Sequence, residues 1–282
     1  MKVKRIGGLI LLFGVLSAQT TGSSRSFLVK VDKVVKGSIE EYVYSYGRIT
    51  GHEEAAVIPP MPGRVVNLLK NEGDKVAKDE VIALLDREIP GVKTEYLQIK
   101  SPIDGIITII NGKVGQYALQ TQPFAYVVSE KQVVEIGVGS EDLGKIRVGA
   151  KSYVFVEKRK VQGRVISKSM ALDPINMTGK VRIALNEGGL PYGTIAQVKV
   201  VVREKRGVLI VPESALVEKG NKYAVYVVNG NVVREVPVEI GIVSEKRAEV
   251  KGDLNPGDLV VTLGAQGLFD GANVTIEQGG EK

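Results

Sequence analysis

The sequence predicts a mainly β protein, because its composition and local patterns favour many short strands joined by tight turns. Glycine occurs 33 times in 282 residues and 44% of the residues are hydrophobic, whereas aromatic residues make up only 5%. Runs rich in valine and isoleucine recur between Gly-Asp, Ser-Pro and Asn-Gly pairs, which are turn signals. β-Branched residues favour strands, and glycine favours turns over helices. We therefore expect strands along most of the chain and helix only as a minor component.

The first residues have the pattern of a targeting segment. A basic start at 2–5 precedes an apolar run over 6–16, and small residues suited to cleavage follow at 17 and 18. The apolar run is shorter than the roughly 20 residues that a membrane-spanning helix needs. Residues 1–18 are thus predicted to be a signal peptide, and an uncleaved N-terminal anchor is the alternative. The chain has no cysteine, so neither a disulfide nor thiol chemistry contributes.

Two strand patterns and a proline-rich stretch come next. Phe27–Val35 alternates apolar and polar residues, and Ser38–Ile49 continues in the same style with tyrosines at 42, 44 and 46. Residues 57–62 contain three prolines, which excludes a central strand there because proline cannot donate to a ladder.

Two half-motifs of similar character follow, over 63–86 and 99–128. The first carries Glu72-Gly73-Asp74 and the second carries Ser101-Pro102. Each is predicted to form short strands broken by turns. The gap over 87–98 contains Pro90-Gly91, which would break a helix. Split into two arms, it provides about 9 Å of helix per arm, far less than the several heptads that a coiled-coil hairpin needs.

The region from 130 to 205 is predicted to be a small antiparallel barrel. The expected strands are 132–138, 152–156, 161–168, 180–185 and 196–202. Ser140 is the expected N-cap of a short helix. The basic run Lys158-Arg159-Lys160 lies between two strand patterns and is predicted to be a solvent-exposed hairpin tip rather than a nucleic-acid patch. Contact of this tip with anionic lipid or a pump surface is the alternative.

The last third of the chain again reads as strands and turns. A strand at 208–211 leads into a short turn at 212–216. Asn229-Gly230 between two valine-rich runs predicts a β-hairpin. Asn255-Pro256-Gly257-Asp258 is a further turn, and short strands are expected up to Ile276.

In this order, the motifs resemble the periplasmic adaptor proteins (membrane fusion proteins, HlyD-like) of bacterial efflux pumps. The two half-motifs are similar to the lipoyl/biotinyl-like β-sandwich of that family. Ala171-Leu172-Asp173-Pro174 is similar to its β-barrel, and Val211-Pro212 with the turn at 255–258 to its membrane-proximal domain. The resemblance covers about 240 residues and is greater to the resistance-nodulation-division (RND) adaptors than to those of ABC-type exporters.

The resemblance implies an elongated multidomain chain whose domains are each built from two distant segments, apart from a contiguous lipoyl-like sandwich. The implied domains are a membrane-proximal β-domain (27–41 plus 206–278), a β-barrel (42–51 plus 130–205) and a lipoyl-like β-sandwich (52–129) with the short loop 87–98 in place of the helical hairpin. Hinges are expected near Gly51 and Glu130, where the domains join.

The function implied is that of a periplasmic adaptor, associated with the inner membrane, which couples an RND-type efflux transporter to export across the envelope. Its implied partners are this transporter, further copies of the chain in a ring and, if the missing hairpin allows, an outer-membrane exit duct; no nucleic acid is expected. The candidate partner contacts are Arg87, Glu88, Lys93, Lys100, Lys158, Arg159 and Lys160. An ABC-type exporter as the transporter, or a solitary periplasmic binding or chaperone module, are the alternatives.

Catalysis, cofactors and metals are not expected. With one histidine, His52, and no cysteine, the chain has no nucleophile elbow and no glycine-rich phosphate loop. In a lipoyl-type carrier the acylated lysine would fall at position 89, which is Ile89, and Lys93 lacks the usual flanking residues. Met61, Met170 and Met177 could bind a soft cation, but isolated methionines more often pack in cores.

Overall fold

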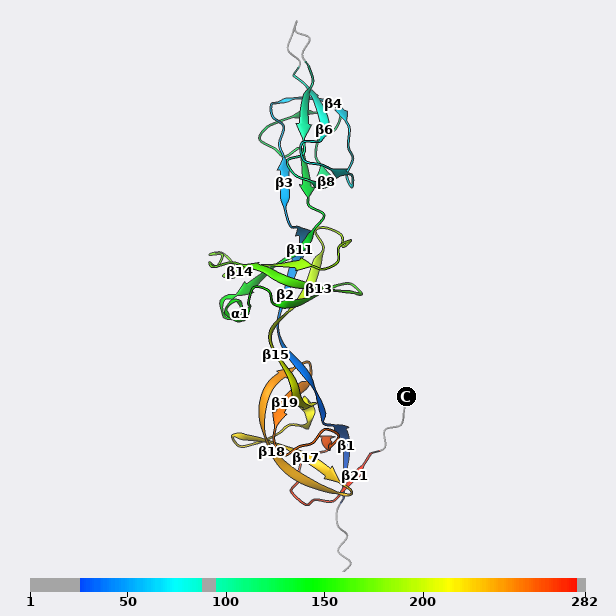
Figure 1. The fold of residues 1–282 in the computed structure, drawn as a ribbon, viewed down its shortest axis with the longest axis vertical. Coiled ribbons are helices and arrows are strands. Elements are labelled where there is room, and N and C mark those ends of the chain that lie inside the picture. The colour runs from blue at the N-terminus through cyan, green and yellow to red at the C-terminus, as the bar shows by residue number, and fades with distance from the viewer. Residues whose placement is uncertain (1–25, 88–94, 278–282) are drawn as a thin grey trace, which may run out of the picture. The chain divides into compact units, whose positions relative to one another are not determined.

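The computed structural model describes residues 26–87 and 95–277, and most of them lie in β-strands. The expected all-β class is confirmed. Contacts between residues divide the chain into two compact units. Each unit is built from segments that are distant in the sequence and therefore differ in colour in Figure 1. Among the described residues, unit 1 comprises those within Met1–Lys36, Leu209–Gly241 and Glu249–Lys282, and unit 2 comprises those within Gly37–Val208 and Ile242–Ala248. The predicted signal peptide lies outside the described residues.

Within unit 2, residues 54–128 form a sandwich of two four-stranded sheets. One sheet has the order β3 (Glu54–Val57), β10 (Ala125–Val128), β8 (Gly105–Ile110) and β5 (Lys75–Val76), and the other has β7 (Leu97–Lys100), β6 (Val81–Asp86), β4 (Gly63–Leu68) and β9 (Tyr117–Ala118). The two half-motifs interlock, because β5 of the first half pairs with β8 and β9 of the second half pairs with β4. Their apolar residues, such as Ile82 and Ile107, fill one core.

The Gly-Asp turns found in the sequence have a common geometry. Gly73 has φ +90°, and the carboxylate of Asp74 accepts a hydrogen bond of 2.7 Å from the backbone of Asn71. The later turn repeats this arrangement: Gly257 has φ +99°, and Asp258 accepts from the backbone of Asn255 at 2.8 Å. Glycine adopts this left-handed conformation without steric cost, and the aspartate side chain closes the turn.

The second part of unit 2 is a closed antiparallel barrel of six strands. Its strands are β2 (Val35–Gly51), β11 (Gln132–Gly139), β12 (Lys151–Val156), β13 (Arg159–Lys168), β14 (Thr178–Leu185) and β15 (Ile195–Pro212). The order is β12-β13-β14-β11-β2-β15, and pairing of β12 with β15 closes the circle. The inward residues form a core rich in valine and isoleucine. A closed barrel leaves no free strand edge.

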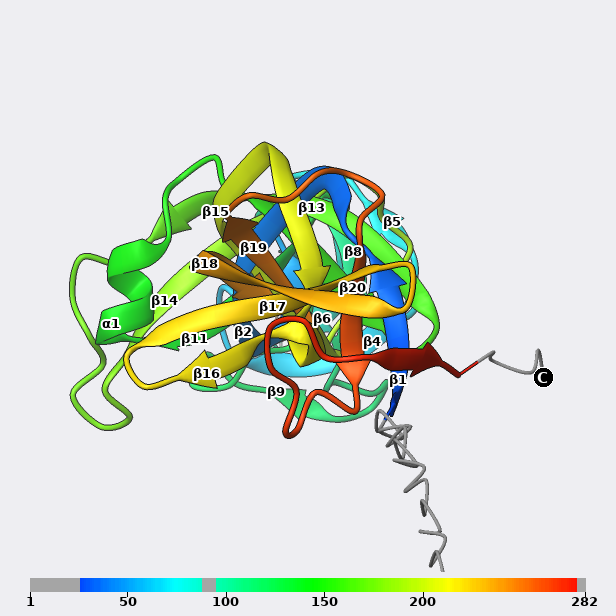
Figure 2. The same cartoon turned by 90° about the horizontal axis from the view of Figure 1, so that it is seen from below.

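The helix and one turn differ from the sequence prediction by a single residue. Helix α1 (Ser140–Lys145) lies beside β14 (Figures 1 and 2), and its N-cap is Gly139, with no side-chain cap. The expected capping role of Ser140 is therefore wrong. The hairpin of β17 (Lys222–Asn229) and β18 (Val232–Ser244) turns through Gly230 and residue 231, one residue later than expected. Gly230 has φ +64°, as the first central residue of a type II′ turn requires.

The remaining strands lie in unit 1, apart from their residues within 242–248, which belong to unit 2. Besides the hairpin β17–β18, these are β1 (Phe27–Lys33), β16 (Val217–Lys219), β19 (Arg247–Lys251), β20 (Leu259–Leu263) and β21 (Val274–Ile276), with the 3₁₀ turn Glu213–Ala215. Strand β1 pairs antiparallel with β20 and parallel with β21. Tyr226 is buried in the core, and its hydroxyl donates to the carbonyl of Leu268 at 2.6 Å. In the part of the chain that the structure describes, no helix has the length and apolar character needed to cross a bilayer.

Candidate interaction surfaces

The tip of the lipoyl-like sandwich is the connection between β6 and β7. Ten residues, 87–96, lie between these strands, and Glu88 and Lys93 lie outside the described residues. Arg87 is half-buried, and its Nε is buried without a hydrogen-bond partner among the described atoms. Lys100 pairs with Val81 at the opposite end of β7, so the fold does not bring Lys100 to the tip. Tyr96, which the sequence interpretation passed over, is 54% exposed there.

The basic run forms a hairpin tip on the barrel. Glu157 and Lys158 make a two-residue turn between paired Val156 and Arg159, and Glu157 has φ +51°. The guanidinium of Arg159 donates to the carbonyl of Gly189 at 3.1 Å. Lys158 is exposed, whereas Lys160 bends back onto the barrel.

Lys160 belongs to a cluster of lysines and aromatic rings on the outside of the barrel, which we call the aromatic–lysine face. The face consists of Tyr42, Tyr44, Lys151, Tyr153, Phe155, Lys160 and Lys199, from β2, β12, β13 and β15. The ammonium of Lys160 lies 4.2 Å from the ring centroid of Tyr153. Lys199 lies 5.2–5.6 Å from three rings. These separations are within the range of cation–π attraction.

The alternation along β2 and β12 is what places these rings together. Successive side chains of a strand point to opposite faces, so every second residue of β2 from 40 to 48 points out of the barrel while Val43 and Ile49 point in. The tyrosine alternation at 42, 44 and 46 was visible in the sequence. The pairing of Tyr153 with Lys199 on the neighbouring strand was not, because it depends on barrel closure.

A half-buried carboxylate anchors one end of the face. Glu40 accepts hydrogen bonds from the hydroxyls of Tyr42 (2.8 Å) and Tyr153 (3.2 Å) and from Lys151 (3.1 Å). Burial raises the pKa of the Glu40 carboxyl, but the three hydrogen bonds outweigh burial and hold this pKa below its ordinary value. Burial and the hydrogen bond to Glu40 raise the pKa of Tyr42.

A polar cavity of about 650 Å³ opens beside Glu40. Acidic and basic side chains line it in equal number: Glu40, Glu204 and Glu245 with Lys151, Arg206 and Arg247. Each of these acids forms an ion pair with a basic residue. The pairs are Glu40 with Lys151, Glu204 with Arg206, and Glu245 with Lys199. The lining thus offers no unbalanced charge to a small ligand, and a mixed surface of this kind suits contact with a protein.

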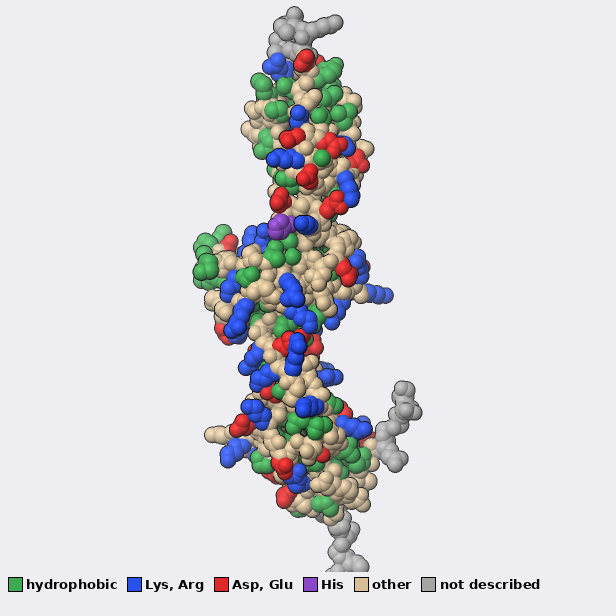
Figure 3. Space-filling view, in the orientation of Figure 1, with side chains coloured by type: hydrophobic (Ala, Val, Ile, Leu, Met, Phe, Trp, Pro, Cys, Tyr) green, Lys and Arg blue, Asp and Glu red, His purple; other side chains and the backbone are tan. Residues whose placement is uncertain are grey.

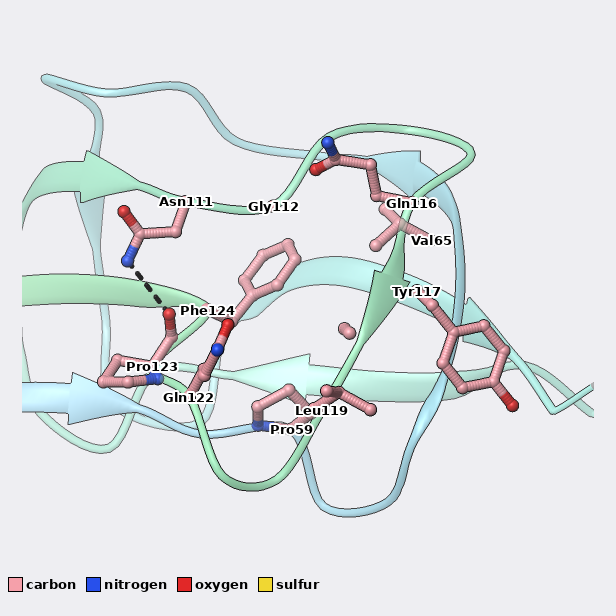
Figure 4. A pocket seen from close by; sticks show the side chains of 11 residues that line it. Pro59, Val65, Asn111, Gly112, Gln116, Tyr117, Leu119, Gln122, Pro123 and Phe124 are labelled. Carbon is pink, nitrogen blue, oxygen red and sulfur yellow. Dashed lines mark hydrogen bonds between the residues drawn. The ribbon is translucent and has the colours of Figure 1, made fainter.

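The sandwich also contains a small pocket, shown in Figure 4. Its volume is about 100 Å³, whereas pockets for small molecules generally measure 300–1,000 Å³. The ring of Phe124 points toward Gly112, and the amide of Asn111 donates to the carbonyl of Pro123 at 3.0 Å (Figure 4). No lysine lines the pocket. Ile89 and Lys93, considered for a carrier role, lie outside the described residues.

The residues considered for metal binding come from three different connections of the fold. Met170 and Met177 are on the β13–β14 loop, Met61 lies between β3 and β4, and His52 follows β2. Among the described residues, no three His, Cys, Asp or Glu side chains are grouped so that they could hold a metal ion.

Comparison with protein families gives two matches. Residues 53–130 match the RND MFP (membrane fusion protein) barrel-sandwich hybrid domain, and residues 208–276 match the YknX C-terminal permuted SH3-like domain. The first match coincides with the sandwich and the second with the C-terminal segments of the fold.

Individual relatives are distant in sequence. The chain is 23% identical over 201 residues to the multidrug resistance protein MdtA of Escherichia coli, covering 66% of this chain and 48% of MdtA. It is 24% identical over 196 residues to MdtA of Pantoea ananatis, covering 64% and 48%. The chain therefore spans about half the length of these curated relatives.

A solved structure has the same fold. MacA from Actinobacillus actinomycetemcomitans superposes with a TM-score of 0.62 at 18% identity, covering 82% of this chain and 98% of MacA. The two domain matches thus lead to one conclusion: the chain belongs to the RND-type membrane fusion proteins, with only ten residues between β6 and β7, where the sequence leaves no room for an α-helical hairpin.

Proposed function

We propose that this protein is the adaptor subunit of a multicomponent efflux pump, which couples an RND-type inner-membrane transporter to export across the envelope. The observation that carries the proposal is the RND-type sandwich at 53–130, between β2 and β11 of the barrel, with the C-terminal domain match at 208–276. The names of its relatives, multidrug resistance proteins, support an efflux role. Periplasmic localisation beside the inner membrane follows from the same relationship.

The role proposed is structural and not enzymatic. Members of this family act as adaptors, and the cores of the sandwich and the barrel are filled by apolar side chains. The connection between these two parts is paired: His52 N–H donates to Lys131 at 2.7 Å, and Ser129 N–H donates to Glu53 at 2.9 Å. Such a two-stranded connection bends as a unit, and we propose it as the hinge near Gly51 and Glu130 through which pump motions pass.

Partner contacts are proposed at two surfaces. The aromatic–lysine face with Lys158 and Arg159 suits a transporter, because tyrosine and arginine are enriched at protein interfaces. Without a helical hairpin, the tip at Arg87 and Tyr96 is the surface left for an exit duct. A ring of several copies and the division into three domains remain part of this proposal.

The decisive experiment asks which membrane protein this chain binds. The full chain, carrying an affinity tag, is expressed in its native host and purified from membranes after mild cross-linking. A protein of about twelve spans with two large periplasmic loops, recovered in fixed ratio, supports the RND proposal. Recovery of an ATPase-linked permease in its place assigns the chain to ABC-type export. If neither is retained, the adaptor proposal is wrong and a solitary binding module becomes the better explanation.

A further inference from the structure

The loop between β13 and β14 exposes apolar side chains. We call residues 169–178, which are this connection and the first residue of β14, the apolar loop. Met170 is 98% exposed and Ile175 is 93% exposed, more than any other large hydrophobic residue that the structure describes, and Met177 is 62% exposed. Figure 3 shows apolar side chains gathered at this side of the barrel. Large apolar side chains grouped in solvent mark interaction sites in soluble proteins.

The conformation of the apolar loop is fixed by its own polar groups. The carboxylate of Asp173 accepts from the backbone of Ile175 at 2.8 Å and of Asn176 at 3.2 Å. The amide oxygen of Asn176 accepts from the backbone and the hydroxyl of Thr178 at 3.0 and 2.6 Å. A backbone bond from Asp173 to Thr178 closes the loop. Because the loop is already ordered, docking it costs less conformational entropy than docking a flexible segment.

The charge of the apolar loop argues for a protein partner over a membrane. Asp173 is its one charged residue. Of the flanking lysines, Lys168 donates to the carbonyl of Leu143 in α1 at 2.9 Å and to that of Ile146, just after the helix, at 2.8 Å. Lys180 pairs with Glu135 at 2.7 Å. Loops and helices that bind anionic bilayers combine apolar residues with lysine or arginine free to meet the headgroups. With one acidic residue and both flanking lysines already bonded, the loop is suited to an uncharged surface of a protein.

The closed barrel makes loops the natural contact points, because it offers no edge strand for pairing with another protein. We propose that the apolar loop inserts into an uncharged, apolar pocket on the extracytoplasmic part of the transporter. This inference rests on the proposed adaptor function and names a docking element for it. Methionine suits such a contact, since its flexible thioether adapts to irregular pockets.

The test compares variants in binding to the transporter that co-purifies with the wild-type chain, reconstituted in nanodiscs. Met170→Ser with Ile175→Ser is the test variant. Ile195→Ser is the matched control, because Ile195 is exposed to 62% on the same unit but lies on β15. We expect at least tenfold weaker binding for the double variant and less than twofold change for the control, with unchanged thermal unfolding for both because all three side chains are exposed.

The other outcomes separate a failure of the docking inference from a failure of the proposed adaptor function. If the wild-type chain binds and the double variant binds equally well, the docking inference is overturned while the adaptor function stands. If the wild-type chain binds no transporter, both fail. Loss of binding to vesicles of phosphatidylglycerol by the double variant, without loss of transporter binding, would assign the loop to the membrane and overturn the proposal. A change confined to self-association would assign it to a second copy of the chain, with the same consequence.

Discussion

The hydroxyl of Tyr42 donates a hydrogen bond of 2.8 Å to Glu40, two residues earlier on the outer side of β2. Tyr153 and Lys151 of β12 donate to the same carboxylate. A single acidic side chain thereby holds together two strands of the barrel and one end of the aromatic–lysine face. Because the carboxylate must be ionised to accept all three bonds, this connection depends on pH.

Tyr42→Phe should destabilise the barrel at neutral pH and make its stability less dependent on pH. The pKa of Glu40 is lower in the folded protein than in the unfolded chain, so its stabilising contribution is present above the unfolded pKa and is lost as pH falls through the folded pKa. Removing one donor raises the folded pKa and costs about 1.5 kcal/mol at pH 7. The difference from wild type should shrink below pH 4. Urea unfolding and carboxyl NMR titration measure both effects, and Tyr46→Phe, on the same side of β2, is the control. A difference from wild type that does not change with pH would contradict this account.

Gln132→Ala should destabilise unit 2 by about 2 kcal/mol, because it leaves buried backbone groups without partners. The buried amide of Gln132 donates to the carbonyl of Leu190 and accepts from its N–H at 3.0 Å. Gln162→Ala removes an exposed glutamine from the same barrel and should change the free energy of unfolding by less than 0.5 kcal/mol. Equal losses in the two variants, measured by urea unfolding, would argue against the Gln132 bonds.

Much of the fold could be predicted from local signals. The Gly-Asp turns at 73–74 and 257–258 require a left-handed glycine and an acceptor side chain. Two adjacent residues meet both requirements, so the sequence alone identifies these turns. The exchange of β5 and β9 between the two halves of the sandwich could not be predicted this way. Each of these strands has only two residues, so no periodicity marks them, and their pairing is set by distant chain segments.

The candidate surfaces were less predictable. Lys158, Arg159 and Lys160 were identified from charge, but contiguous charge does not reveal that Lys160 lies over Tyr153. Lys100 was named as a partner contact together with Arg87, Glu88 and Lys93 near the short loop, whereas pairing with Val81 places it at the far end of β7. The apolar loop was missed as a surface because isolated methionines usually pack in cores. The signal present was the pair of turn-forming residues, Asp173 and Asn176, that lies between Met170 and Met177.

Gly112→Ala should destabilise the sandwich by about 1–3 kcal/mol, as overpacking of a core does. An added Cβ would lie 2.0 Å from Cε2 of Phe124, which is buried in the core. Gly144→Ala is the opposite case: nothing lies within 4 Å of its Cβ position in α1, so alanine should stabilise the helix by up to about 1 kcal/mol. The thermal unfolding temperatures of the two variants should shift in opposite directions. If Gly112→Ala leaves the unfolding temperature unchanged, the ring of Phe124 can move away from the added methyl group.

Charge reversal at the basic hairpin tip should slow association with the transporter. Lys158→Glu with Lys160→Glu reverses two cations, and charges at interfaces act mainly on the association rate and its salt dependence. We expect at least a tenfold slower association at low salt, converging with wild type at high salt. Lys78→Glu with Lys113→Glu makes the same net change on exposed positions of the sandwich. If both variants slow association equally in surface plasmon resonance, net charge rather than this hairpin steers binding.

The tip of the sandwich should matter for a distal partner and not for the transporter. Tyr96 presents a half-exposed ring next to β7, and Arg87 lies at the end of the neighbouring strand β6. Aromatic side chains and arginine dominate the binding energy of protein interfaces. A photo-crosslinking residue at position 96 should therefore capture an outer-membrane duct in cells, while transporter binding stays within twofold of wild type. The same residue at position 114, an exposed valine on the sandwich, should capture far less. Capture of the transporter from position 96 would reverse the assumed orientation of the adaptor, because it would bring the hairpin-free tip to the inner membrane.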